Sequence, residues 1–371
     1  MENLKITGID IYTLSDASNP ISDSTMRIGK FGSVILDVQT NSDIRGVGVG
    51  VLEMSDDAVR SSLEWLGKHV IGMNPLANED VYQRMLQVTR GFGRKGYAFQ
   101  LISAIDIALW DIKGKAAKLP LFRLLGGTKN RIPIYYSGGW TSYSTDRLVN
   151  EAIFAVAEGY KHVKIKVGVE GGKNTREDVR RVAAVRKAIG DDVELILDAN
   201  NAWTAGVAAK FAQDIAEYNI LFFEEPCMAD DIPGLAHVRS KASMPIATGE
   251  HEYTRYGTRD LMLGNALDIF QGDVCRIGGF TELLKANAIA QAWNLQFAPH
   301  CADFIHSHLV SAAPNGFILE RLANKDNLIE KLYLHPPIPR DGFLDIPELP
   351  GLGLEPDYEY IKACQDTGFI K

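Results

Sequence analysis

Short apolar runs that end at a charged or turn residue recur through the second two-thirds of the chain. Eight of them lie between about residue 131 and residue 320, and longer segments with helical periodicity separate them. Strands buried on both faces have this composition, and strand–helix alternation is typical of parallel α/β folds. Eight repeats predict a TIM-like barrel, in which functional residues lie at the carboxyl ends of the strands. The expected strand cores are IPIYYS, HVKIKV, VELILD, LFFE, PIAT, DIFQ, QFAP and FILE.

The first 127 residues follow a different pattern. Three runs at 5–13, 32–40 and 45–52 predict an antiparallel meander with one covered face. Helical periodicity begins near residue 56 and is strongest over 98–116, and Asn78 and Asp80 are candidate N-caps of an intervening helix. A meander followed by helices predicts a separate α+β domain.

Three carboxylates stand at the ends of consecutive barrel strands. Asp198, Glu224 and Glu250 follow one another at intervals of 26 residues, about the length of one βα unit. Three ionised carboxylates in one place require a cation, and hard oxygen ligands favour Mg²⁺ or Mn²⁺ over zinc. The alternative is that each acid pairs with a neighbouring Lys or Arg. Strand alternation allows only one of Glu224 and Glu225 to point into the barrel, and we assign Glu224.

Candidate proton-transfer groups lie on other strands. Lys164 and Lys166 are two residues apart on one strand and share a face, so mutual repulsion is expected to lower one pKa and create a general base. Pairing with the nearby acids is the alternative. Asp273 and His300 follow the sixth and seventh strands, where the carboxylate would fix the imidazole tautomer. Glu320 ends the eighth strand and could contact a substrate oxygen.

Composition and charge narrow the possible partners and the cellular location of the protein. The 371 residues are 46% hydrophobic and 23% charged, with a formal net charge of −8 that argues against nucleic acid as a partner. We see neither a signal-peptide pattern nor an apolar run near the roughly 18 residues of a membrane span, and expect a cytoplasmic protein. The four cysteines form no C-x-x-C pair, which favours reduced thiols. A soft-metal site of Cys301 with His306 and His308 is a weaker alternative.

Together these stretches resemble the enolase superfamily and, more narrowly, its mandelate racemase subgroup with the acid-sugar dehydratases. The similar stretches, in family order, are ISDST, SAIDIALWDIKGKAAKLPLFRLLGG, HVKIKVG, LDANNAW, FFEEP, ATGEH, QGDVCRIGG, APHCADFIHSHL, FILE and PGLGLEPD. The resemblance implies an α/β fold: a modified (β/α)₇β TIM barrel over residues 128–330, with an α+β capping domain over 1–127. The tail at 331–371 would return to complete that domain.

The resemblance also implies roles for individual residues. The implied ligands of Mg²⁺, with Mn²⁺ as a substitute, are Asp198, Glu224 and Glu250. The implied catalytic residues are the base Lys166, its pKa-lowering partner Lys164, the opposing dyad His300 and Asp273, and Glu320 at a substrate carboxylate oxygen. The implied substrate-side residues are Asn200, Ser22 and Asp23.

The resemblance implies a function as well. A Mg²⁺-dependent enzyme would remove the proton α to the carboxylate of an aldonate or aldarate through a metal-stabilised enediolate. Loss of the 3-hydroxyl would then give a 2-keto-3-deoxy acid. A racemase or epimerase of a 2-hydroxy acid would use the same Lys and His, and a non-catalytic sugar-acid binding protein is a further alternative. A muconate-type cycloisomerase is disfavoured, because the family places a second lysine base near 273–275, where this chain has Asp-Val-Cys.

Substrate and assembly are less well determined by the sequence. GEHEYTRYG resembles L-rhamnonate dehydratases, whereas ISDST resembles talarate/galactarate-type enzymes, and the two hints point to different substrates. Arg94 and Lys95 could contact a distal substrate carboxylate or be solvated. The family implies a homo-oligomer.

Overall fold

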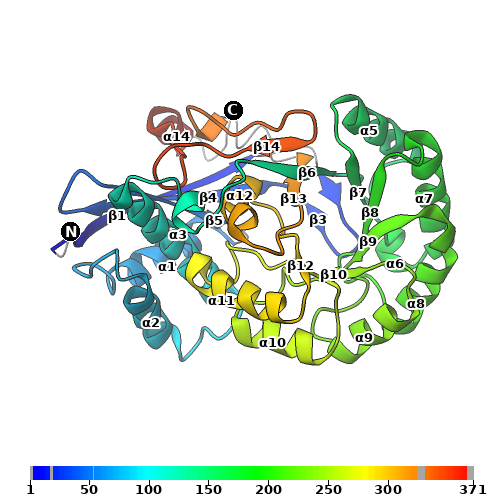
Figure 1. The fold of residues 1–371 in the computed structure, drawn as a ribbon, viewed down its shortest axis with the longest axis horizontal. Coiled ribbons are helices and arrows are strands. Elements are labelled where there is room, and N and C mark those ends of the chain that lie inside the picture. The colour runs from blue at the N-terminus through cyan, green and yellow to red at the C-terminus, as the bar shows by residue number, and fades with distance from the viewer. Residues whose placement is uncertain (1–2, 17–19, 53, 324–330, 366–371) are drawn as a thin grey trace.

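The computed structural model describes residues 3–16, 20–52, 54–323 and 331–365 (Figure 1). The chain begins with a three-stranded antiparallel sheet in the order β1-β4-β5. Its strands are β1 (Ile6–Asp16), β4 (Phe31–Thr40) and β5 (Gly46–Val51). The predicted meander is therefore confirmed. Between β1 and β4 the loop forms a small hairpin of β2 (Ile21–Ser22) and β3 (Arg27–Ile28), which the sequence pattern did not indicate.

The helices α1 (Asp56–Gly67) and α3 (Tyr97–Ala117) pack on this sheet, and α2 (Asn78–Thr89) packs against α3. The glycines of β5 allow α3 to pack closely, because a Cβ at Gly48 would lie 2.2 Å from the Ala104 carbonyl oxygen. The prediction of Asn78 as an N-cap is wrong. Ala77 is the N-cap of α2 without a side-chain hydrogen bond, and Asn78 is a buried first residue of the helix. Asp80 is the third residue of α2, so it does not cap the helix either.

All eight predicted barrel strands are present, and each pairs in parallel with its neighbour in the order β12-β11-β10-β9-β8-β7-β6-β13. The ends of this sheet are joined by a parallel bridge between Phe297 and Gly316. The strands are β6 (Arg131–Ser137), β7 (His162–Lys166), β8 (Glu194–Asp198), β9 (Ile220–Glu224), β10 (Ile246–Thr248), β11 (Ile269–Phe270), β12 (Gln296–Phe297) and β13 (Leu319–Leu322).

A helix follows each of the first seven strands, and these helices surround the sheet (Figure 1). They are α5 (Thr145–Ala157), α7 (Thr175–Ile189), α8 (Ala205–Asp214), α9 (Ile232–Lys241), α10 (Arg255–Leu263), α11 (Gly279–Ala292) and α12 (Asp303–Ala312). Short segments α6 (Val169–Gly172) and η1 (Ala216–Tyr218) lie in the connections. A separate apolar cluster drawn from seven of the eight strands or their immediate ends fills the barrel, as expected of a packed core. The arrangement is the expected (β/α)₇β barrel.

The C-terminal segment contacts both units. Its strand β14 (Phe343–Asp345) pairs with β6, and the Leu352 N–H donates to Asp111 Oδ1 of α3 at 2.8 Å. Helix α14 (Tyr358–Gln365) lies beside β1, with the rings of Tyr12 and Tyr358 5.7 Å apart, and α4 (Leu121–Leu124) links the two units. The boundary expected at residue 330 falls in 324–330, outside the described residues. Within the described part of the chain, no helix has the length and apolar character needed to cross a membrane.

Candidate active site

Strand register sets the charged residues side by side. Lys166 of β7 is paired with Asp198 of β8, and Asp198 with Glu224 of β9. Glu224 is in turn paired with Ala247, three residues before Glu250. Each residue lies at the last position of its strand or just beyond it, so parallel pairing brings side chains from distant parts of the sequence to one rim of the barrel.

The two lysines are ion-paired with the acids. Lys164 Nζ lies 2.9 and 2.8 Å from the two oxygens of Glu224, 2.7 Å from Glu320 Oε1 and 3.5 Å from Asp198 Oδ2. Lys166 Nζ donates to Asp198 Oδ2. Burial disfavours both charges, but Glu224 and Glu320 hold the pKa of Lys164 well above its usual value, and Asp198 raises that of Lys166. The expected lowering of a lysine pKa is therefore not found, because attraction by the acids outweighs repulsion between the ammonium groups.

The three carboxylates differ in their surroundings. Burial and the charge of Asp198 raise the pKa of Glu224 to about 8, even though Lys164 and Gln271 both donate to it. Burial also opposes ionisation of Glu250, but His300 and Arg276 depress its pKa below the usual range. Glu250 Oε2 is buried without a hydrogen-bond partner among the described residues. A buried, unpartnered carboxylate oxygen beside other anionic oxygens is a donor set that suits a hard divalent cation.

The carboxylates are not gathered into one compact group. Among the described residues, the triads whose ligand atoms all lie within 4.8 Å are Glu225 with Glu250 and His251, and His300 with Cys301 and Glu320. Lys164 contacts oxygens of both Asp198 and Glu224 instead, and Lys166 contacts Asp198. A cation held by those oxygens would take over the neutralising part that the ammonium groups have here.

His300 and Asp273 form the expected pair across the barrel from the lysines. Asp273 Oδ2 lies 2.9 Å from His300 Nδ1, and Asp273 Oδ1 accepts from the Cys275 N–H at 2.7 Å. Burial lowers the pKa of His300, but Cys301, Glu250 and Asp273 together raise it well above its usual value. The imidazole is thus oriented through Nδ1, with Nε2 as its other ring nitrogen.

Glu320 is held at both oxygens. Oε1 accepts from Ser137 Oγ at 2.7 Å and contacts Lys164, while Oε2 accepts from the Cys301 N–H at 2.8 Å. Burial opposes its charge, but Lys164 keeps its pKa well below the usual range. Glu320 is therefore an ionised hydrogen-bond acceptor of this rim.

The substrate-side residues occupy two different places. Asn200 joins the rim, since its N–H and side-chain amide donate to Asp198 at 2.8 and 3.3 Å. Asp23 Oδ1 accepts from the N–H groups of Thr25 and Met26 and so shapes its own loop, and the Ser22 carbonyl oxygen accepts from the Thr141 N–H.

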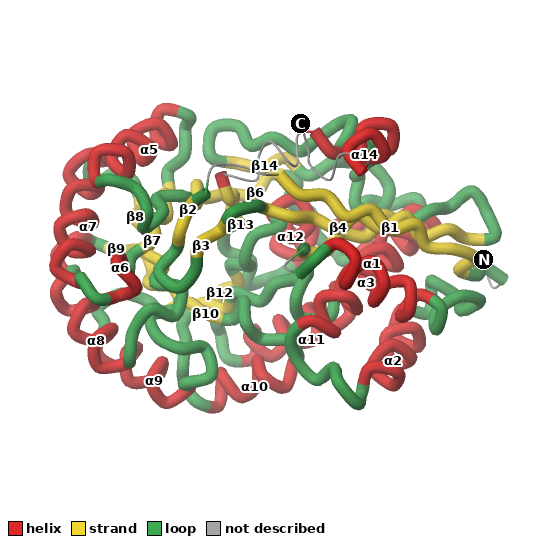
Figure 2. The backbone as a smooth tube through the Cα atoms, turned by 180° about the vertical axis from the view of Figure 1, so that it is seen from behind, coloured by secondary structure: helices red, strands yellow, loops and turns green. Residues whose placement is uncertain are grey.

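Ser24, which the sequence did not single out, is the residue of this loop that reaches the rim. Its hydroxyl donates to the Ala199 carbonyl at 2.5 Å, just beyond β8. The hairpin formed by β2 and β3 accordingly lies over the strand ends in Figure 2.

The expectation that one of the two adjacent acids points away from the barrel is wrong for Glu225. Its φ of 42° breaks the strand alternation beyond β9, and its side chain is fully buried. Its Oε2 accepts from Asn201 Nδ2 at 2.9 Å, and its Oε1 lies 3.7 Å from His251 Nδ1.

Arg276 is a second residue that sequence reasoning missed. It donates to Glu250 Oε1 at 3.1 Å and lies 3.6 Å from Asp273 Oδ2, so it links a candidate metal ligand to the His300 dyad. The only sequence signal was its place in QGDVCRIGG.

The suggested soft-metal set of Cys301, His306 and His308 is not assembled. His306 Nε2 accepts from the Val274 N–H, and His308 Nδ1 accepts from the Phe122 N–H, so both rings have structural roles. Lys95 lies 3.6 Å from Glu252 and 3.8 Å from Asp230, and Arg94 is exposed.

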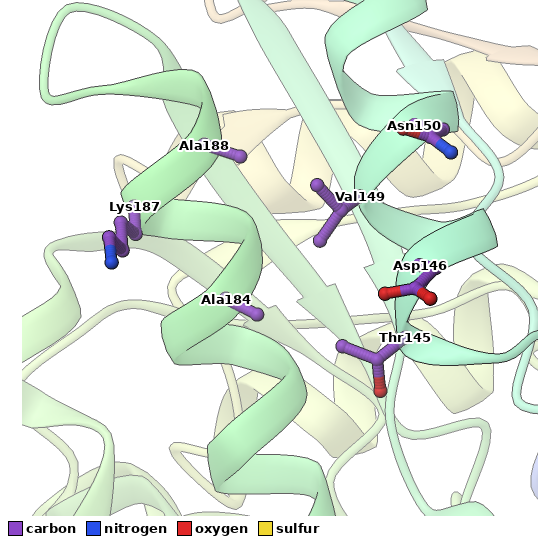
Figure 3. A pocket seen from close by; sticks show the side chains of 7 residues that line it. All are labelled: Thr145, Asp146, Val149, Asn150, Ala184, Lys187 and Ala188. Atoms are coloured by element: carbon purple, nitrogen blue, oxygen red, sulfur yellow. The ribbon is translucent and has the colours of Figure 1, made fainter.

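A hollow of about 580 Å³ lies elsewhere, between α5 and α7 on the outside of the barrel (Figure 3). Thr145, Asp146, Val149 and Asn150 face Ala184, Lys187 and Ala188 across it. None of the candidate site residues lines it, so it carries no part of the chemistry considered below.

Comparison with known proteins agrees with this geometry. The family described as mandelate racemase / muconate lactonizing enzyme, N-terminal domain, matches residues 8–126, and that described as enolase C-terminal domain-like matches 147–361. Arabinonate dehydratase of Saccharolobus solfataricus is 33% identical over 332 residues, covering 86% of this chain and 87% of its own.

Two further relatives differ in activity. D-galactarolactone cycloisomerase of Agrobacterium fabrum is 30% identical, covering 95% of this chain and 96% of its own. The crystal structure of L-talarate/galactarate dehydratase from Salmonella typhimurium LT2, liganded with Mg and L-lyxarohydroxamate, superimposes with a TM-score of 0.89. It is 29% identical and covers 96% of this chain and 92% of its own.

Proposed function

The chain belongs to the mandelate racemase / muconate lactonizing enzyme group of the enolase superfamily, and from this premise we propose that it is a Mg²⁺-dependent acid-sugar dehydratase. The observation that carries the proposal is the placement of two side chains able to transfer protons, Lys166 and His300, on opposite sides of one carboxylate rim. Lys166 lies on β7, and the pair of His300 and Asp273 follows β12 and β11. An acid and a base that face the same reacting carbons suit an elimination.

Asp198, Glu224 and Glu250 would hold the metal, because their buried oxygens form an all-carboxylate donor set. When bound there, Mg²⁺ supplies positive charge beside the substrate carboxylate and so lowers the cost of removing the proton α to it. Asn200, which donates to Asp198, would keep that carboxylate oriented.

The chain's own residues supply the proton transfers. The neutral form of Lys166 or His300 removes the C2 proton, and the protonated form of the opposite group donates a proton to the departing 3-hydroxyl, which leaves as water. The resulting enol becomes a 2-keto-3-deoxy acid. Asp273 holds the imidazole by its Nδ1, and Glu320 is placed to accept a hydrogen bond from the substrate. A relative that is a dehydratase of an aldonate and another of aldarates support this class of substrate.

A screen of purified protein with Mg²⁺ against aldonates and aldarates tests the proposal. We expect EDTA-sensitive formation of 2-keto-3-deoxy acid from a narrow stereochemical set. Incorporation of deuterium at C2 from D₂O without keto acid would show a racemase or epimerase instead. A lactone converted to an open acid would point to a cycloisomerase, the activity of the Agrobacterium relative. No turnover of any kind would leave a sugar-acid binding protein.

We also propose that the chain forms a homo-oligomer. Large apolar side chains are exposed on α5, where Ile153 and Phe154 are 46% and 54% accessible in the single chain. Light scattering after gel filtration should give a mass of at least two chains, and a mass of one chain would contradict this.

A further inference from the structure

Three metal-ligating side chains of different chemistry meet beside the proton-transfer site. The ligand atoms of His300, Cys301 and Glu320 all lie within 4.8 Å of one another, and Cys301 Sγ is 3.2 Å from His300 Nε2. We propose that they form a site for a soft divalent cation, zinc in particular, separate from the all-carboxylate Mg²⁺ site.

The backbone aims the thiol at the imidazole. Cys301 and Ala302 have φ angles of 49° and 42°, a left-handed conformation that residues with a Cβ adopt only when their surroundings enforce it. The surroundings here are specific. The Cys301 N–H donates to Glu320 Oε2 at 2.8 Å, and its carbonyl oxygen lies 2.7 Å from His306 Nδ1. The turn between β12 and α12 is thus fixed at both peptide groups of Cys301.

The distances suit zinc. With Zn–S near 2.3 Å and Zn–N near 2.0 Å in a tetrahedral site, the sulfur and nitrogen ligands are about 3.5 Å apart. The observed 3.2 Å between Cys301 Sγ and His300 Nε2 requires only a small adjustment. Thiolate and imidazole select zinc and similar metals, whereas Mg²⁺ prefers oxygen ligands throughout.

Neighbouring groups orient the ligands as they do in zinc proteins. Asp273 lies 2.9 Å from His300 Nδ1, which leaves Nε2 as the ligand atom of a carboxylate–histidine–metal arrangement. Glu320 is anchored at its other oxygen by Ser137 and Lys164. Three protein ligands leave one position of a tetrahedral ion open to water or substrate.

Such binding would inhibit turnover. A cation on His300 Nε2 removes the nitrogen that the proposed dehydration uses for proton transfer. This consequence rests on the proposed function, whereas the binding itself does not. The soft-metal site would therefore make the enzyme sensitive to zinc at a place distinct from the Mg²⁺ ligands.

The experiment uses Co²⁺ as a spectroscopic probe of the full-length protein. A thiolate bound to Co²⁺ gives a charge-transfer absorption in the near ultraviolet, which cobalt on carboxylates alone does not. We expect this band in the wild type and in Cys364→Ser, a control with another buried thiol far along the chain, and its loss in Cys301→Ser. Zn²⁺ should abolish the band at stoichiometric amounts, and a large excess of Mg²⁺ should leave it.

Absence of the band in the wild type, or its persistence in Cys301→Ser, would overturn the proposal. If Cys301→Ser fails to fold, His300→Asn gives the same test, because it removes a second ligand. In assays with Mg²⁺, inhibition by Zn²⁺ is measured against each protein's own uninhibited rate. The Zn²⁺ concentration for half-inhibition should be at least tenfold higher in Cys301→Ser than in the wild type. A cobalt band without any dehydratase activity would keep the site and reject the proposed function.

Discussion

Lys166 and His300 reach one rim of carboxylates from strands on opposite sides of the barrel. Their surroundings differ: Lys166 is paired with Asp198, whereas His300 is oriented by Asp273 and contacts Glu250 at 3.5 Å. Arg276 contacts both Glu250 and Asp273. The residues at the rim are therefore one electrostatic unit, in which each charge has a named counter-charge.

Replacement of either proposed proton-transfer residue should reduce turnover without unfolding the protein. We expect Lys166→Met and His300→Asn each to lower kcat on the order of 10²–10⁴-fold, the usual contribution of a positioned acid or base. Lys161→Met is the matched control, because Lys161 is exposed just before β7, where its carbonyl oxygen accepts from the Glu194 N–H. Circular dichroism verifies the fold. Equal rates for Lys166→Met and Lys161→Met would remove Lys166 from the mechanism.

The sequence predicted those site residues that depend on strand register alone. Asp198 and Glu224 end strands that are buried on both faces, so pattern and position agreed. Ser24, Glu225 and Cys301 could not be placed that way. Their positions depend on a hairpin of two-residue strands or on left-handed backbone beyond a strand, and neither produces a periodic pattern.

At the scale of elements, a buried carboxylate fixes α3 of the N-terminal unit to α11 of the barrel. Asp106 accepts from the Thr281 N–H at 2.9 Å and from its hydroxyl at 2.5 Å. Burial raises the pKa of Asp106 to about 7 in spite of these bonds. The protonated form is therefore favoured in the folded state relative to the unfolded chain.

This contact should contribute a pH dependence to stability. The unfolded carboxyl titrates near pH 4 and the folded one near 7, so the contribution is fully present below about pH 4 and is lost as the pH rises to 7. Relative to Asp106→Asn, the wild type should lose on the order of 4 kcal/mol of unfolding free energy over this range. Urea unfolding of both proteins at several pH values measures the difference. If the unfolding free energies of the two proteins changed in parallel with pH, Asp106 would titrate normally.

The return of the C-terminal segment depends on one glycine. Gly351 has φ of 76°, and a Cβ there would lie 2.1 Å from Asp111 Oδ1, the acceptor of the Leu352 N–H. Gly351→Ala should therefore lower stability by about 2–4 kcal/mol. Gly206→Ala in α8 is the control, since open space surrounds that site and the change should stabilise by about 0.5 kcal/mol. Similar unfolding midpoints for both variants would contradict this account.

The presence of helices and strands was easier to predict than the residues at which they begin and end. All eight barrel strands followed from apolar runs, because burial on both faces leaves a continuous signal. The start of α2 could not be predicted from the sequence pattern, because Asn78 is a residue type common at N-caps yet is buried inside the first turn. Residue type alone does not show which way the entering chain turns.

At the scale of the whole molecule, the N-terminal unit contacts the acidic rim of the barrel through Ser24, whereas the C-terminal segment pairs with the opposite end of β6. Acids from β8, β9 and the turn beyond β10 make this rim costly without cations, and two lysines partly neutralise it here. A ligand that binds only the folded rim stabilises the whole fold by mass action.

Mg²⁺ should therefore raise the melting temperature. At 100 times its dissociation constant, the gain in unfolding free energy is about 2.7 kcal/mol. Glu250→Gln should lose most of this gain, because a carboxylate ligand is removed. Glu252→Gln should keep it, since Glu252 is buried two residues away but contacts Lys95. Thermal scans with and without Mg²⁺ measure the shift, and an equal response of both variants would exclude Glu250 as a ligand.

The central claim is that Lys166 and His300 are opposed proton-transfer groups on one metal-dependent site. The most direct measurement is mass spectrometry of substrate and product after incubation of the screened sugar acid in D₂O with wild type, Lys166→Met and His300→Asn. The account predicts that the wild type forms keto acid only with Mg²⁺. It also predicts that both variants form keto acid on the order of 10²–10⁴-fold more slowly, and that the variant lacking the residue that abstracts the proton loses C2 exchange as well. Keto acid formation in EDTA, or by both variants at the wild-type rate, would contradict the account.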